Sequence, residues 1–287
     1  GRSTGRDELT NIPDPPDLTS NKSNDLFYET INIGEQLGHL EYRVTEKMLN
    51  EYCSTVEYWQ SGYVNLAIGE FYQVLSNKYG PITLSSCGRM DYYYRPPIID
   101  RRIQVSGWIR DKYISEGIEY LVVGTLAIDD IGTEILKTQQ TFSIGINQPS
   151  SISITNVEPQ ALQRLPILEK KIDKRAWDRI KNFNRVFEIG DSASMSKQET
   201  GNLLSFAYAH ELLAETYGMD FLKGGLLNIN FCNSLLPDQI CTISANVYET
   251  SEVSERAKTD LNVLVTRQDG VPVASGKAII LIPSPIT

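Results

Sequence analysis

The feature that most restricts the fold of this chain is an internal repeat with an offset of 138 residues. Turn residues recur by chance, but a constant offset over several landmarks favours duplication of one structural unit. The landmark pairs are Leu75 and Leu213, Tyr79-Gly80 and Tyr217-Gly218, Asp100 and Asp238, and Gly132 and Gly270. We therefore expect two diverged copies of one fold in a single chain.

Each copy contains one long apolar stretch. The stretches at 64–80 and 202–218 both end at a glycine, the residue that most often follows the last turn of a helix. They predict helices over about 64–79 and 201–217. Both helices are apolar on most faces, so we expect other structure to wrap around them.

Three strand-like segments follow each predicted helix. They alternate apolar and polar side chains and are rich in β-branched residues, as half-buried antiparallel strands are. The segments are 101–113, 119–129 and 135–146 in the first copy, and 239–249, 259–268 and 273–283 in the second. The pattern predicts an α+β fold in which each copy curls an antiparallel sheet around its own helix.

The rest of the chain divides around these copies. Residues 1–25 are polar and rich in proline, which is typical of a flexible arm. We assign 26–145 to the first domain, 146–186 to a linker and 187–287 to the second domain. Within the linker, LEKKIDKRAWDRIKNF predicts a charged surface helix that acts as a connector.

Composition and charge argue against several classes of binding partner. A net charge of −9 argues against nucleic acid and against an anionic membrane surface as the main partner. No apolar stretch reaches the ~20 residues of a membrane span. The chain has four cysteines without CxxC spacing and two histidines, so a zinc site is not expected. Scattered cysteines of this kind indicate reduced residues in a cytoplasmic protein.

Several segments resemble MaoC-like hydratase domains. In the first half these are LFYETINIGEQLGHLEYRVTEKMLNEYCSTV and YYYRPPIIDRRIQVSG, and in the second GNLLSFAYAHELLAETYG and QDGVPVASGKAIILIP. The likeness covers about 26–145 and 187–283. It implies a double hotdog fold and reversible addition of water to a 2-enoyl thioester of coenzyme A or a carrier protein. It also implies no metal and no cofactor beyond the coenzyme A part of the substrate, with a homodimer as a possible assembly.

The chemistry implied by the resemblance needs a base, an acid and donors to the enolate oxygen. The family supplies an Asp and a His in a D-x-N-P-x-H loop before the hotdog helix, and backbone N–H groups at the start of that helix. Neither half contains the loop. We expect its place to lie between Glu199 and Gly201, with Thr200 replacing a family His. Gly201 and Asn202 then match the oxyanion-binding positions.

The repeat suggests a loss at this place. VTEK at 44–47 aligns with MSKQ at 195–198, an offset of 151, which would make the second copy 13 residues shorter there. Two explanations stay open. Either both halves lack the loop and are non-catalytic, or the printed sequence omits residues of the loop.

Other candidate residues are weaker. His210 shares a helix face with apolar residues and is more typical of a packed core histidine than of a catalyst. His39 lies in a polar turn and is interpreted as structural. Asp191 and Glu57 flank the expected loop and are candidate bases, with a solvated carboxylate as the simpler interpretation. Arg95 could meet a phosphate of coenzyme A, but we favour an ion pair with Asp91 or Asp100.

The function we predict is hydration or dehydration of a 2-enoyl or 3-hydroxyacyl thioester. The alternatives are a non-catalytic hotdog protein that binds acyl thioesters or supports a partner subunit, and a hotdog thioesterase. Fold alone does not separate these activities.

Overall fold

A computed structural model describes residues 28–47, 50, 84–145, 160–181, 197–253 and 256–283, and the predicted helix at 64–79 lies outside them. The elements are β1 (Gln36–Arg43), β2 (Leu84–Tyr93), β3 (Arg102–Ser115), β4 (Ile118–Asp129), β5 (Glu134–Ile144), β6 (Gln163–Arg164), β7 (Leu168–Lys171), α4 (Lys174–Lys181), α5 (Lys197–Tyr217), α6 (Met219–Leu222), β8 (Leu226–Phe231), β9 (Ile240–Val253), β10 (Arg256–Arg267) and β11 (Pro272–Pro283).

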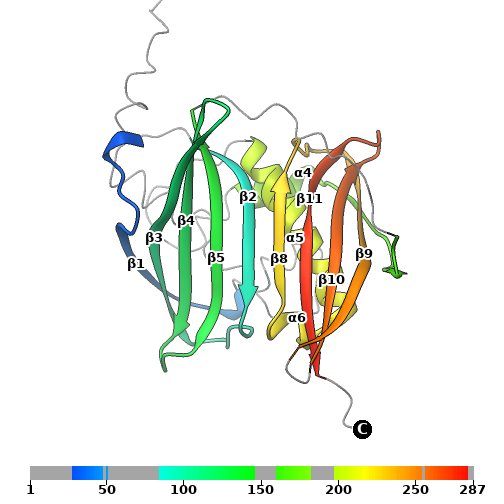
Figure 1. The fold of residues 1–287 in the computed structure, drawn as a ribbon, viewed down its shortest axis with the longest axis horizontal. Helices are drawn as coiled ribbons and strands as arrows, with labels where there is room; N and C mark the ends of the chain where they lie inside the picture. The colour runs from blue at the N-terminus through cyan, green and yellow to red at the C-terminus, as the bar shows by residue number, and fades with distance from the viewer. Residues whose placement is uncertain are drawn as a thin grey trace, which may run out of the picture.

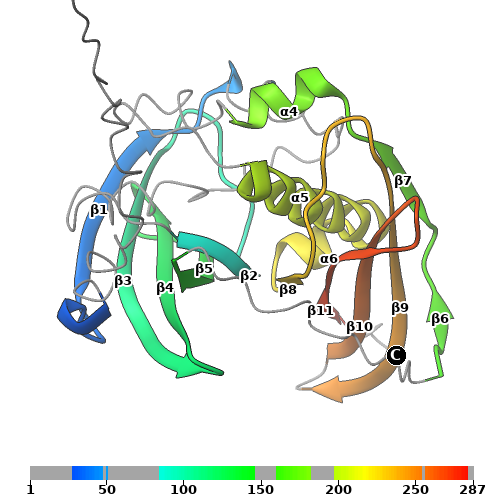
Figure 2. The same cartoon turned by 90° about the horizontal axis from the view of Figure 1, so that it is seen from above.

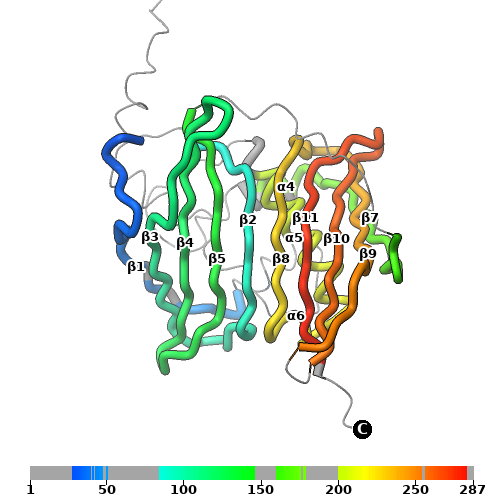
Figure 3. The backbone as a smooth tube through the Cα atoms, viewed as in Figure 1, coloured from blue at the N-terminus to red at the C-terminus, as the bar shows by residue number. Residues whose placement is uncertain are grey.

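Within the described residues, one antiparallel sheet of 11 strands runs through both halves (Figures 1 and 3). Its order is β1-β3-β4-β5-β2-β8-β11-β10-β9-β6, and β7 also pairs with β9. Strands β2 and β8 meet at the centre, which we call the seam. All six predicted strand segments are confirmed, as β3 to β5 and β9 to β11.

The two sides of the seam follow the same plan. Moving outward from it, the first half places β2, β5, β4, β3 and β1, and the second places β8, β11, β10, β9 and then β6 and β7. Met90 of β2 pairs with Asn228 of β8, and these positions differ by the repeat offset of 138. An approximate twofold axis therefore passes through the seam at this pair.

The same backbone geometry recurs at equivalent turns of the two halves. Asp100 and Asp238 both have a positive φ, of 65° and 63°, and Gly132 and Gly270 have 78° and 81°. Positive φ is uncommon for residues other than glycine, so its recurrence at Asp100 and Asp238 is a specific match. Asp100 lies in the turn before β3, and Asp238 lies in the turn before β9. Each of these strands follows a seam strand in the sequence.

Helix α5 lies on the concave side of the sheet. Figure 2 shows both halves curling to the same side, with α5 inside the curve of the second half. The helix is apolar on most of its surface, and residues such as Leu204, Phe206 and Leu213 are fully buried. Helix α5 begins one turn earlier than expected, at Lys197.

The predicted linker is wrong in part. LEKK, interpreted as helical, forms strand β7 on β9, and the helix begins only at Lys174. Ile172 and Trp177 are buried in the core, so this segment is part of the second half rather than a surface connector.

The position of β7 changes the alignment of the repeat. Asp100 donates its N–H to the Val44 carbonyl over 2.7 Å, and Asp238 donates to the Ile172 carbonyl over 2.9 Å. Val44 and Ile172 are thus equivalent, with an offset of 128, whereas the offset after the helix is 138. Between these points the second half is 10 residues longer, and the predicted shortening by 13 residues is wrong.

Candidate functional site

The start of α5 lies beside the seam, where the sequence predicted an oxyanion site. The helix runs without a break through Thr200 and Gly201, so the family's loop does not interrupt the chain there. Gly201 is the fifth helical residue, and in a regular α-helix its N–H donates to the carbonyl of Lys197. The predicted role of Gly201 and Asn202 as oxyanion donors is not tested by any of these contacts and stays a prediction.

Gly201 has a packing role that only a residue without a side chain can fill. A Cβ atom at this position would lie 2.4 Å from the carbonyl oxygen and 3.0 Å from the nitrogen of Leu235. The loop that follows β8 therefore crosses directly over the start of α5. This close approach holds the second half's loop against the helix.

Asn202 ties the start of α5 to the first half. Its Nδ2 donates to the backbone carbonyl of Ser86 on β2 over 3.1 Å, and its side chain is buried. One turn along the helix, Ser205 donates its hydroxyl to the Gly201 carbonyl over 2.9 Å. Residues of both halves thus meet at this end of the helix.

A buried charged cluster lies further along β2, under α5. Arg89 donates from Nε and Nη2 to the two carboxylate oxygens of Asp91, over 2.8 and 2.9 Å, and the Tyr93 hydroxyl donates to the same carboxylate over 3.2 Å. All three are buried. The guanidinium lies 4.7 Å from the centre of the Phe206 ring on α5. Burial raises the pKa of Asp91, and the charge of Arg89 opposes that shift.

His210 lies next to this cluster, and its interpretation as a packed core residue is confirmed. Its ring centre is 5.2 Å from that of Tyr93 and 5.3 Å from that of Phe221. Burial, with the nearby positive charge of Arg89, lowers the pKa of His210 to about 3. The imidazole is therefore neutral near pH 7.

A second buried charge fastens α5 to the outer strand β7. Glu211 is 2% exposed, and its carboxylate lies 2.6 Å from the Lys170 ammonium group. The same ammonium lies 5.7 Å from the centre of the Tyr208 ring. The neighbouring residues His210 and Glu211 therefore contact different strands, His210 on the side of Tyr93 of β2 and Glu211 on the side of Lys170 of β7.

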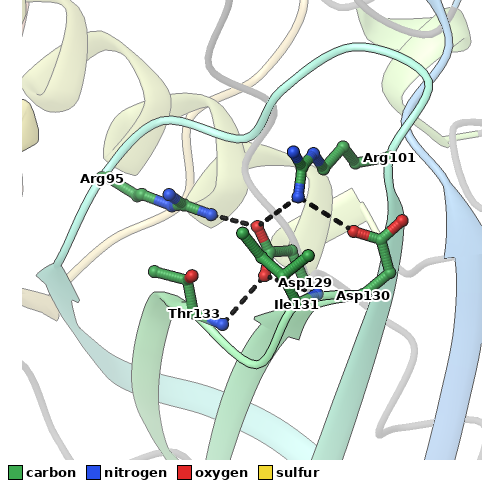
Figure 4. Close-up of polar contacts among 6 residues, drawn as sticks. All are labelled: Arg95, Arg101, Asp129, Asp130, Ile131 and Thr133. Carbon is green, nitrogen blue, oxygen red and sulfur yellow. Dashed lines mark hydrogen bonds and ion pairs between the residues drawn. The ribbon is translucent and has the colours of Figure 1, made fainter.

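Arg95 has a structural partner, although not one of those predicted. It pairs with Asp129 at the end of β4, as Arg101 does at 3.7 Å, and Arg101 also reaches Asp130 at 3.2 Å (Figure 4). Despite its burial, Asp129 has a lowered pKa because it accepts backbone hydrogen bonds from Thr133 and Ile131 and faces both arginines.

This ion-pair cluster lies at the opposite end of β2 from the Asn202 contact. Ser86, which binds Asn202, is near the beginning of β2, whereas Arg95 follows its last residue. Fold support by an ion pair is confirmed for Arg95, and the predicted partners Asp91 and Asp100 are wrong. Arg95 therefore stands apart from the start of α5.

The remaining candidates have simpler outcomes. His39 is an exposed residue of strand β1, not of a turn. Asp191 and Glu57 lie outside the described residues, as does Cys53. Among the other cysteines, Cys241 is buried and Cys87 and Cys232 are half-buried, and all three are free thiols. The structure does not describe the side chain of Glu199.

Sequence reasoning missed the cluster of Arg89, Asp91 and Tyr93. The signal was available: their repeat counterparts Leu227, Ile229 and Phe231 are apolar. Within the described ranges, no group of three acidic, His or Cys side chains could hold a metal ion. No helix in that part of the chain has the length and hydropathy needed to cross a membrane.

The arrangement of strands and helix matches solved structures. A MaoC-like dehydratase aligns with a TM-score of 0.61 and 9% identity, over 90% of this chain and 100% of that one. A protein described as a MaoC-domain dehydratase from Chloroflexus aurantiacus aligns with a TM-score of 0.61 and 8% identity, over 90% and 97%.

A structure described as that of an oleoyl thioesterase from Lactobacillus plantarum aligns less well. Its TM-score is 0.51 at 10% identity, over 88% of this chain and 98% of that one. No family model and no curated protein matches the sequence. At this level of identity the likeness is one of fold, and the chain has the hotdog-type fold of MaoC-like dehydratases.

Proposed function

We propose that this protein is a double hotdog that adds water to, or removes it from, a 2-enoyl or 3-hydroxyacyl thioester of coenzyme A or a carrier protein. The alignment over the full length of a MaoC-like dehydratase carries the proposal. The duplicated strand order about the seam supports the double hotdog. The proposal needs no metal and no cofactor beyond the substrate's own coenzyme A, and it places the protein in the cytoplasm.

The start of α5 is the proposed place of the thioester carbonyl. The first N–H groups of a helix have no partner within it and carry partial positive charge, which suits an oxygen that becomes negative in the reaction. Asn202 and Ser86 hold this end of α5 to β2, so both halves contribute to the site. Gly201 allows the Leu235 backbone to pack directly against this end of the helix.

The acid and the base are proposed from chain order. The family's loop precedes the hotdog helix, and in this chain α4 ends at Lys181 and α5 begins at Lys197. Asp191 lies in the segment between them, so we propose it as the base in preference to Glu57. The segment has no histidine. A water molecule or a hydroxyl group would then have to relay the proton that the family's His supplies.

The test is a hydration assay on the purified chain. Enoyl-CoA substrates of several lengths are added, and loss of the enoyl absorbance is followed with detection of the 3-hydroxyacyl product by mass spectrometry. Asp191→Asn should reduce the rate by roughly 10² or more, as removal of a positioned base does. Asp130→Asn, an exposed carboxylate beside Arg101, is the control and should keep the rate. Absence of hydration over the whole panel would reject the proposal.

Two other functions follow from specific observations. The thioesterase among the structures favours hydrolysis, which releases a free thiol that a thiol reagent detects in the same reactions. The lack of the D-x-N-P-x-H loop favours a non-catalytic protein. Calorimetry would then show thioester binding without either product.

A further inference from the structure

A row of polar side chains crosses the concave face of the first half. Asp91 pairs with Thr138, Thr138 pairs with Thr125, and Arg89 pairs with Gln140. Residues directly opposite each other in a sheet share a face, and Arg89 lies against Phe206 of α5, so this face is the concave one. The hydroxyls of Thr125 and Thr138 lie 2.5 Å apart. We call these five residues the polar row.

The second half has no counterpart of the polar row. The same register recurs there, with Ile229 opposite Gly276 and Gly276 opposite Val263. The full set of counterparts is Leu227, Ile229, Val263, Gly276 and Ala278. The hotdog-type unit therefore folds with an apolar row at these positions. Because buried polar groups cost stability relative to apolar ones, the fold itself gives no reason for the polarity of the first half.

The polar row leads away from the start of α5. Ser86, which binds Asn202, pairs with Phe142, two residues along β5 from Gln140. Gln140 is half-buried, whereas Thr138 and Thr125 further along the row are 4% and 2% exposed. Gln140 is thus the most accessible member of the row, whereas Arg89 and Asp91, which lie under α5, are 3% and 0% exposed.

The charges of the row cancel. Arg89 and Asp91 bind each other through two hydrogen bonds, and the other three members are uncharged. A carboxylate or an ammonium group on a ligand would find no net opposite charge here. Hydroxyl and amide side chains instead exchange hydrogen bonds with a neutral polar group.

We infer that the polar row determines specificity for the acyl part of the substrate. With the thioester carbonyl at the start of α5, the acyl chain extends along the concave face of the first half. The row selects an acyl chain that bears an uncharged hydrogen-bonding group, such as a hydroxyl or keto group, beyond the reacting carbons. A plain alkyl chain would displace water from the half-buried Gln140 amide without replacing its hydrogen bonds, which is the stronger form of discrimination. The inference rests on the proposed function.

The experiment measures binding of two saturated acyl-CoA ligands by calorimetry, so that it does not depend on turnover. The ligands have equal length, and one carries a hydroxyl group near its far end. We expect the hydroxylated ligand to bind roughly tenfold more tightly, the effect of about one hydrogen bond. Equal or weaker binding of that ligand overturns the inference and leaves the proposed function standing. Failure of both ligands to bind counts against the proposed function itself.

Variants locate the discrimination. Gln140→Leu and Thr138→Val should each reduce the preference for the hydroxylated ligand several-fold, with Gln140→Leu the safer variant because its side chain is half-buried. Thr141→Val is the matched control, on the same strand and on the opposite face, and should keep the preference. Thermal unfolding checks that each variant is folded. An unchanged preference in folded Gln140→Leu and Thr138→Val overturns the assignment to this row.

Discussion

The buried pair of Arg89 and Asp91 provides a quantitative test of the structure. Both side chains are almost fully buried, at 3% and 0% exposed, and they share two hydrogen bonds. Removal of one partner leaves the other as a buried charge without compensation, which costs about 3–5 kcal/mol of unfolding free energy. We therefore expect Arg89→Leu and Asp91→Ile each to destabilise the protein by about that amount.

The double variant should behave differently. Arg89→Leu with Asp91→Ile gives β2 the side chains that β8 carries at Leu227 and Ile229. Replacement of a complete buried ion pair by apolar residues is often neutral or stabilising. The Tyr93 hydroxyl would still lose its acceptor, a cost of about 1–3 kcal/mol. We expect the double variant to be far more stable than the sum of the single losses predicts.

The assay is urea unfolding of the wild-type protein, the two single variants and the double variant. The unfolding free energy of each is obtained by linear extrapolation to zero urea. The control is Arg267→Leu, because Arg267 binds Asp269 through the same two guanidinium atoms at 3.1 and 2.7 Å. That pair is 21% and 52% exposed, so its loss should cost much less unfolding free energy than the loss of either buried partner. If the single losses at Arg89 and Asp91 simply add in the double variant, the coupling inferred from their geometry is refuted.

Two further perturbations test the environment of α5. Because the folded pKa of His210 is about 3 and its ordinary value is 6.5, its contribution to stability is complete above about pH 6.5 and is lost as the pH falls toward 3. Between about pH 6.5 and pH 5, the wild-type protein should lose about 2 kcal/mol more unfolding free energy than His210→Gln does. The control variant His39→Gln should lose as much as the wild-type protein. Gly201→Ala should lower the unfolding temperature, because a Cβ at this position would lie 2.4 Å from the Leu235 carbonyl oxygen. Such overpacking costs roughly 1–3 kcal/mol, which exceeds the ~1 kcal/mol that alanine gains over glycine in helix propensity. An equal or higher melting temperature would contradict the close approach.

The parts of the fold that the sequence predicted are those specified by local patterns. Period-2 alternation placed β3 to β5 and β9 to β11, and the apolar run placed α5. The matching turns at Asp100 and Asp238 could be found because a positive φ favours the same few residue types in both copies. These signals act over a few residues and need no knowledge of tertiary contacts.

The errors occurred where distant segments decide the structure. LEKK is charged and precedes a helical pattern, so it resembles a helix, but pairing with β9 makes it strand β7. Tertiary contacts override such weak propensities. The misplacement of β7 shifted the alignment of the repeat, and the shift produced the predicted deletion before Gly201. The same local reading could not pair Arg95 with Asp129, because these residues are 34 positions apart and meet only in the folded sheet.

The repeat separates what the fold requires from what has been added to it. Positions that are alike in both halves, such as the turn aspartates and glycines, build the unit itself. Positions that differ at equal register are free to serve another purpose. Arg89, Asp91 and Thr138 differ in this way from Leu227, Ile229 and Gly276. The two sets lie at equivalent positions, the first on β2 and β5 and the second on β8 and β11. Because the apolar set shows that the unit folds without polarity here, the polar set in the first half is better explained by what it contacts than by the fold.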